Sequence, residues 1–311
     1  MRLVILFLAF CVCVFAGDIK PQKTVSLDSP AVDISYNGKA LYISTAKGDI
    51  FEIDKNKKPK KIASLPQIPS QIGGMRNQKA FTLDVSKSGS TLFVGGEDGY
   101  LYMVGGGAFK KTSFKTSAVI KKVAAISDTA VLIGLVSSQV ILYDTAKNKK
   151  IYEIQIGTST FGDMALSEDA KTAAVATEAG AVHILDVLGG KMRGVYKNVN
   201  LDNIYKIDYK NKTLITAGQD RKSTVITDTG ALKARFDGEF LIYAAALSPS
   251  AQKGAAAINE QNDIAVFDIP SKTKIATAKG HTATLNKIVF LGENEFVSAA
   301  DENKIIFWSV K

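Results

Sequence analysis

The chain has 311 residues, a formal net charge of +9 and 46% hydrophobic residues, enough to bury a large core. Only five of its 39 basic residues are arginine, the side chain that makes bidentate contacts to phosphate and guanine, so the composition argues against nucleic-acid recognition. Both cysteines lie within the first sixteen residues, so the rest of the chain can form no disulfide, thiolate metal site or cysteine nucleophile.

The first sixteen residues predict a secretory signal peptide. Arg2 precedes the apolar run Leu3–Phe15, and small residues mark a cleavage site after Ala16. The run is shorter than the roughly 20 residues of a membrane span, and neither cysteine follows the small residue that lipidation requires. A buried N-terminal strand or helix is the alternative interpretation. We expect a soluble periplasmic protein of 295 residues, which is 311 less the 16 that are removed.

A repeat of about forty residues fills the rest of the chain. In six units the third strand ends in apolar residues followed by one polar residue. These polar residues are Asp54, Asp144, Asp186, Asp228, Asp268 and Ser309. The spacings from Asp144 onward are 42, 42, 40 and 41 residues, and the 90 residues before Asp144 leave room for two units. Four short strands at this period are typical of a propeller blade. We therefore predict an all-β fold, a seven-bladed β-propeller of four-stranded antiparallel blades over residues 17–311, with a pair of sandwiches as the alternative.

The last unit contains only three recognisable strands. Its final strand, Ile305–Val310, would leave an open sheet edge, which exposes unpaired backbone groups to aggregation. A spare strand, Lys23–Ser29, precedes the first unit. We expect this N-terminal strand to join the last blade and close the ring.

The final unit also resembles the repeat of WD-repeat propellers. It contains Gly280-His281 and ends in Trp308-Ser309, close to the G-H and W-D pairs of that family. The resemblance implies a hydrogen-bonded structural network of His281, Ser298, Glu302 and Trp308. Glu302 stands where the family has aspartate, and Ser309 replaces the aspartate after tryptophan. The other six units lack both pairs.

The whole chain is similar to the NapL family, exported propellers encoded beside the periplasmic nitrate reductase of ε-proteobacteria. The shared features are the short signal peptide, about 300 lysine-rich residues, seven degenerate units and a mature chain without cysteine. The resemblance implies an accessory role in maturation or activity of that enzyme system. Its partners would then be a periplasmic molybdenum reductase or its cytochromes.

No pattern in the chain marks a catalytic site. The two histidines, His183 and His281, have no second histidine or cysteine at ligand spacing, so we interpret both as structural. A nucleophile elbow, a phosphate loop and a calcium loop are absent from the sequence, and no helix follows the glycine-rich Val104–Phe109, which we interpret as a turn. We predict no enzyme activity, cofactor or metal. A propeller enzyme such as a sugar lactonase is the alternative.

Charge divides unequally between two sets of turns. The turns between second and third strands carry a net charge of −5, and those between third and fourth strands carry +11. These sets lie on opposite faces of a propeller, so we predict one basic face. This face would attract an acidic partner or an anionic membrane surface. The alternative is that its lysines only keep the hairpins soluble. The densest cluster consists of Lys55, Lys57, Lys58, Lys60 and Lys61.

The segment Ser64–Gln78 is long for a propeller loop. It carries Met75 and Arg76, which we consider candidate partner-binding residues on the face opposite the lysine cluster; a loop without function is the alternative. The prediction is a monomeric, non-enzymatic propeller that binds protein partners, without nucleic acid or a membrane span. An envelope or outer-membrane assembly scaffold is the alternative within the binding class.

Overall fold

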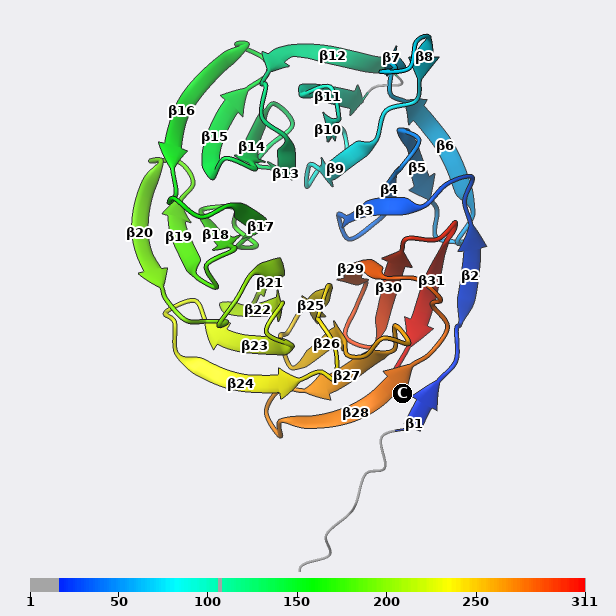
Figure 1. Ribbon diagram of the computed structural model, residues 1–311, viewed down its shortest axis with the longest axis vertical. Helices are drawn as coiled ribbons and strands as arrows, with labels where there is room; N and C mark the ends of the chain where they lie inside the picture. Colours follow the sequence, from blue (N-terminus) through cyan, green and yellow to red (C-terminus); the bar gives the residue numbers. More distant parts are fainter. Residues whose placement is uncertain (1–16, 106–107, 311) are drawn as a thin grey trace, which may run out of the picture.

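The computed structural model describes residues 17–105 and 108–310, and all regular structure in these ranges is β-strand. Seven sheets surround a central channel as the blades of a β-propeller (Figure 1). This confirms the predicted fold class and the seven-unit repeat. The predicted signal peptide lies outside the described residues, as does part of the glycine-rich turn. The described part of the chain contains no helix long and apolar enough to cross a membrane.

Blades 1 to 5 are antiparallel meanders that run from the channel outward. Blade 1 contains β3 (Ala31–Tyr36), β4 (Leu41–Thr45), β5 (Asp49–Ile53) and β6 (Pro59–Ser64). Blade 2 contains β9 (Ala80–Val85), β10 (Leu92–Gly96), β11 (Tyr100–Gly105) and β12 (Ala108–Lys115). Blade 3 contains β13 (Ile120–Ala125), β14 (Ala130–Leu135), β15 (Gln139–Asp144) and β16 (Lys149–Gln155).

The remaining blades follow the same order. Blade 4 contains β17 (Phe161–Leu166), β18 (Thr172–Thr177), β19 (Val182–Asp186) and β20 (Lys191–Tyr196). Blade 5 contains β21 (Ile204–Lys210), β22 (Thr213–Gly218), β23 (Lys222–Thr227) and β24 (Leu232–Asp237). Blade 6 contains β25 (Ala245–Leu247), β26 (Lys253–Ala257), β27 (Ile264–Asp268), β28 (Thr273–Ala278) and an added β1 (Gly17–Ile19). Blade 7 contains β29 (Leu285–Phe290), β30 (Glu295–Ala300), β31 (Lys304–Ser309) and β2 (Lys23–Ser26).

The hydrophobic core is divided into seven clusters, each of which lies between two neighbouring blades. All residues of β4 and β22 are buried, whereas exposed positions alternate along the outer strand β20. Successive side chains of a strand point to opposite faces, so a middle strand is buried on both faces only when its blade has two neighbours. This explains the nearly continuous apolar runs in the second and third strands of each unit.

The N-terminal segment closes the ring, as the sequence predicts. β2 pairs antiparallel with β31, with Val25 opposite Ile305, and both side chains are buried between blades 7 and 1. β2 is shorter than the predicted strand because the last backbone hydrogen bond, from Leu27 to Asn303, comes before the turn into blade 1. The sequence did not predict β1, which pairs in parallel with β28 at the edge of blade 6. The N-terminal segment thus covers the outer edges of two blades (Figure 1).

Replacing Val25 with aspartate should test the closure. Val25→Asp places an unpaired carboxylate in the cluster between blades 7 and 1, so we expect the free energy of unfolding to fall by at least about 3 kcal/mol. Thr24→Asp, on the exposed side of the same strand, should change it by less than about 0.5 kcal/mol. Urea denaturation measures both. Equal losses in the two variants would contradict closure through β2.

Candidate functional site

Six of the seven inner strands contain a bulge at a corresponding position. The register with the second strand shifts just before Asp33, Thr82, Lys122, Asp163, Lys206 and Lys287. We call these six residues the channel ring. A bulge bends the strand and re-aims the next side chain. The inner strand of blade 6, β25, reads Ala-Ala-Leu and contributes no charge.

Ion pairs join the channel ring across the centre of the propeller. Lys122 Nζ of blade 3 lies 2.9 Å from Asp33 Oδ2 of blade 1, and Lys287 Nζ of blade 7 lies 3.4 Å from Asp33 Oδ1. Asp33 is only 5% exposed. Burial by itself raises the pKa of Asp33, but Lys122 and Lys287 together outweigh it and hold that pKa well below its usual range. Asp33 likewise keeps the pKa of the buried Lys122 above its usual range.

The same inner strands are also joined by side-chain to backbone hydrogen bonds. The first strand of a blade is the edge strand nearest the channel. Its amides on the side away from the second strand therefore have no hydrogen-bond partner within the sheet. Carboxylate and hydroxyl oxygens of one blade accept from amides of the next at 2.8–3.3 Å. These bonds join Asp33 to Leu83, Thr82 to Val123, Asp84 to Ala125, Asp163 to Ile207 and Asp208 to Leu247. Four of the aspartates thus act as links between blades.

Lys206 differs from the other two lysines of the channel ring. Among the described residues, no carboxylate oxygen lies within 4.0 Å of its Nζ. Burial lowers the pKa of Lys206; Asp163 opposes this shift, and Lys287 adds to it. Lys206 is therefore a half-buried amine in the channel without a carboxylate in direct contact.

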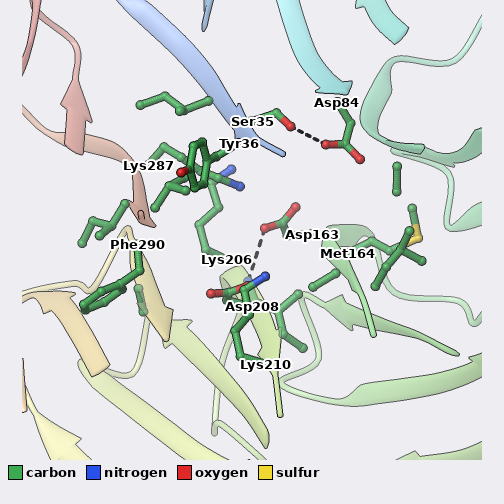
Figure 2. Close-up of a pocket in the computed structure, with 18 of the residues that line it drawn as sticks. Ser35, Tyr36, Asp84, Asp163, Met164, Lys206, Asp208, Lys210, Lys287 and Phe290 are labelled. Carbon is green, nitrogen blue, oxygen red and sulfur yellow. Dashed lines mark hydrogen bonds and ion pairs between the residues drawn. The ribbon is translucent and has the colours of Figure 1, made fainter. Parts of the chain in front are cut away.

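The channel widens into a cavity on each side of the ring. The first cavity, of about 500 Å³, opens where the inner strands end, on the face of the lysine-rich turns. Figure 2 shows Lys206 and Asp208 of β21 and Lys287 of β29 approaching this cavity. The second, of about 460 Å³, opens where the inner strands begin, on the face of the loops between blades, which we call the loop face. Lys206 lines both cavities.

The structure brings together the four residues of the expected structural network. Trp308 Nε1 donates to Ser298 Oγ at 2.7 Å, and Ser298 Oγ lies 2.6 Å from His281 Nε2. His281 Nδ1 lies 2.5 Å from Glu302 Oε1, and the other carboxylate oxygen, Oε2, accepts a hydrogen bond from Thr282 Oγ1 at 2.7 Å. Burial lowers the pKa of His281 and Glu302 offsets this only in part, so the ring is neutral at pH 7. The serine hydroxyl then donates to Nε2, and Nδ1–H donates to the carboxylate.

The lysine cluster does not act as one free surface. Lys55, Lys58, Lys60 and Lys61 are exposed at the β5–β6 turn and along β6. Lys57 instead reaches Gln22 Oε1 at 2.5 Å and lies 4.9 Å from the centre of the Phe307 ring. Lys57 therefore contributes to the contact between blade 1 and the ring closure, which lysine composition alone could not indicate.

The long loop after blade 1 contains a small hairpin. Its strands, β7 (Ile68–Pro69) and β8 (Met75–Arg76), pair antiparallel on the loop face. The Arg76 guanidinium forms two bonds to Glu97, at 2.7 and 2.9 Å, so it anchors the hairpin to the β10–β11 turn. Ile72 is 98% and Met75 59% exposed. The candidate Met75 is thus available to a partner, whereas Arg76 is occupied by Glu97.

The structure offers no grouped metal ligands in its described ranges. No three His, Cys, Asp or Glu side chains there are placed to hold an ion. His183 lies in β19, and its buried Nδ1 has no hydrogen-bond partner among the described residues. Burial lowers the pKa of His183, which is therefore a neutral imidazole at pH 7.

Sequence reasoning missed the channel ring. A signal exists in the sequence, because each of six first strands carries at least one charged or hydroxyl residue among apolar neighbours, such as Asp33 in "AVDISY" and Lys287 in "LNKIVF". A charge inside a buried strand is costly unless it meets a partner. Comparing the same position across all seven units could have placed these residues at one level of the channel.

The fold and the last-blade network define a WD-repeat-like seven-bladed β-propeller. A solved chain from "Crystal Structure of Mitotic Checkpoint Complex" is similar over 100% of this chain and 99% of that chain, with a TM-score of 0.80 and 15% sequence identity. At this identity the likeness shows the fold alone. No protein-family model matches the sequence, and no curated protein matches it.

Removing the serine at the centre of the network should be costly. Ser298→Ala leaves buried Trp308 Nε1 and His281 Nε2 without partners, so we expect the free energy of unfolding to fall by about 2–4 kcal/mol. The exposed Ser137→Ala is the matched control and should change it by less than about 0.5 kcal/mol. Urea denaturation followed by Trp308 fluorescence measures both. A loss no larger than that of the control would rule out a stabilising network.

The ion pairs of the channel ring predict a coupled effect. Lys122→Met leaves Asp33 with Lys287 as its only ion-pair partner, so we expect the free energy of unfolding to fall by about 2–3 kcal/mol. This is less than the roughly 3–5 kcal/mol expected for a buried charge with no partner. In an Asp33→Asn background, Lys122→Met should lower the free energy of unfolding by clearly less. A double-mutant cycle by urea denaturation gives the coupling energy, and a coupling near zero would disprove the ion pair.

Proposed function

We propose that this protein is a non-enzymatic, exported propeller that binds a protein partner through its loop face. The observation that carries the proposal is the anchored hairpin β7–β8, which presents Ile72 and Met75 to solvent. Large apolar side chains on a fixed projection lose little conformational entropy on binding, and such residues form the anchors of many interfaces.

The surroundings of the hairpin support this choice of face. Arg76 and Glu97 fasten its base, and the buried Gln78 donates to the Pro66 carbonyl at 2.8 Å. A rigid scaffold that presents loops is a common arrangement for binding surfaces. The opposite face, with its exposed lysines, would add long-range attraction for an acidic partner rather than a defined contact.

The narrower form of the proposal concerns the partner. The sequence resemblance to NapL-type propellers supports an accessory role for a periplasmic molybdenum reductase of the nitrate reductase class, or for its cytochromes. Export rests on the signal-like first sixteen residues, with cleavage near Ala16. Within this proposal the propeller positions or protects its partner and carries out no chemistry of its own.

Affinity purification of the tagged protein from its native periplasm, after mild crosslinking, tests the proposal. We expect a molybdenum reductase or its cytochromes among the co-purified proteins identified by mass spectrometry. Ile72→Ser with Met75→Ser should reduce their recovery at least about tenfold, the effect of losing roughly 1.4 kcal/mol. Leu188→Ser with Leu232→Ser is the matched control, because these two leucines, in the β19–β20 turn and in β24, are also exposed; it should leave recovery unchanged.

Two further outcomes separate the alternatives. If Lys55→Glu, Lys58→Glu and Lys60→Glu together abolish recovery while the hairpin variant does not, the partner binds the lysine-rich face instead. Lys57 is left unchanged in this variant because it contacts Gln22 and Phe307. Recovery of no specific protein by the wild type would overturn the binding role.

A further inference from the structure

The loop-face cavity of the channel has an aromatic wall. Phe81, Tyr205 and Tyr243 line it, and the rings of Tyr205 and Tyr243 stack with centroids 4.8 Å apart. Tyr205 is held in place because its hydroxyl donates to Gln219 Oε1 at 2.7 Å. The volume of about 460 Å³ is in the range of pockets that bind small molecules. This wall is suited to a planar or apolar group.

The same cavity is positively charged. Lys79, Lys121 and Lys206 line it, and Asp301 is the one carboxylate among its described lining residues. Asp301 accepts a hydrogen bond from Asn286 Nδ2 at 2.9 Å. No ion pair within 4.0 Å joins any of these three lysines to a described carboxylate. The cavity therefore favours an anion.

Lys206 stands at the inner end of this cavity, since it also lines the cavity on the other side of the ring. Lys122 and Lys287 share Asp33, whereas Lys206 has no direct partner. Lys206 is half-buried. An ammonium group partly shielded from water is stabilised by a nearby opposite charge, and a bound anion would supply that charge. One negative charge is enough to do so.

We propose that the loop-face cavity binds a small organic monocarboxylate, with its carboxylate on Lys206 and its apolar body against Tyr205, Tyr243 and Phe81. The aromatic wall suits the apolar body, and Lys206, the one member of the channel ring among the three lysines, suits the single charge. The two features lie in one cavity but come from blades 2 and 5 and from the segment before blade 6, so only the folded ring assembles them. The proposal does not depend on the partner-binding role.

Isothermal titration calorimetry on the mature protein tests the proposal with benzoate as the probe. Acetate carries the charge without the body, and benzyl alcohol carries the body without the charge. We expect benzoate to bind at least about tenfold more tightly than either compound at constant ionic strength, because only benzoate uses both features. Lys206→Met and Tyr243→Ala should each weaken benzoate binding about tenfold or more.

Lys210→Met is the matched control, because Lys210 lines only the cavity on the other side of the ring. It should leave benzoate affinity unchanged. Lys206→Met should unfold at the same or a higher urea concentration than the wild type, since it removes a half-buried amine that has no carboxylate partner, so its loss of binding cannot be ascribed to misfolding. Unchanged benzoate binding in Lys206→Met, or no binding of benzoate to the wild type at millimolar concentration, would overturn the proposal.

Discussion

The whole propeller depends on one pairing, that of β2 with β31. Each blade buries both faces of its middle strands against neighbours, so a blade without a neighbour exposes an entire apolar face to water. Six of the seven blade interfaces form between segments that follow one another in the chain. The seventh, between blades 7 and 1, requires Val25 and Leu27 from the N-terminal segment to pack against Ile305 and Phe307. Closing that interface removes the last exposed faces together.

Polar contacts hold the centre of the ring, and hydrophobic contacts hold its periphery. Asp33 forms ion pairs with Lys122 and Lys287 at the centre, and Asp33 and Asp163 also accept hydrogen bonds from amides that the sheet ladder leaves free. Lys206 is the exception, because it completes no such pair. A group that weakens the stability of the free protein is a reasonable place to look for ligand binding.

The repeat in the sequence predicted the blades because turn residues and apolar runs recur with almost constant spacing. The last-blade network could also be predicted, since the Gly280-His281 and Trp308 motif specifies its members. The channel ring could not be placed in the same way. A bulge adds one residue to a strand and thereby reverses the alternation of its side chains, so pattern alone does not show which way Asp33 or Lys206 points. β1 could not be predicted either, because three residues are too few to show a pattern and their pairing depends on the position of blade 6.

The pairing of β2 with β31 also has a consequence for incomplete chains. The two strands are separated by about 280 residues, so this contact forms late compared with the local hairpins of blades 1 to 5. A product truncated before β31 would keep Val25 and Leu27 without their cluster and would expose an apolar face of blade 1. Such faces are what chaperones and proteases recognise in unfinished proteins. A shortened product would therefore expose an apolar surface that the closed ring buries.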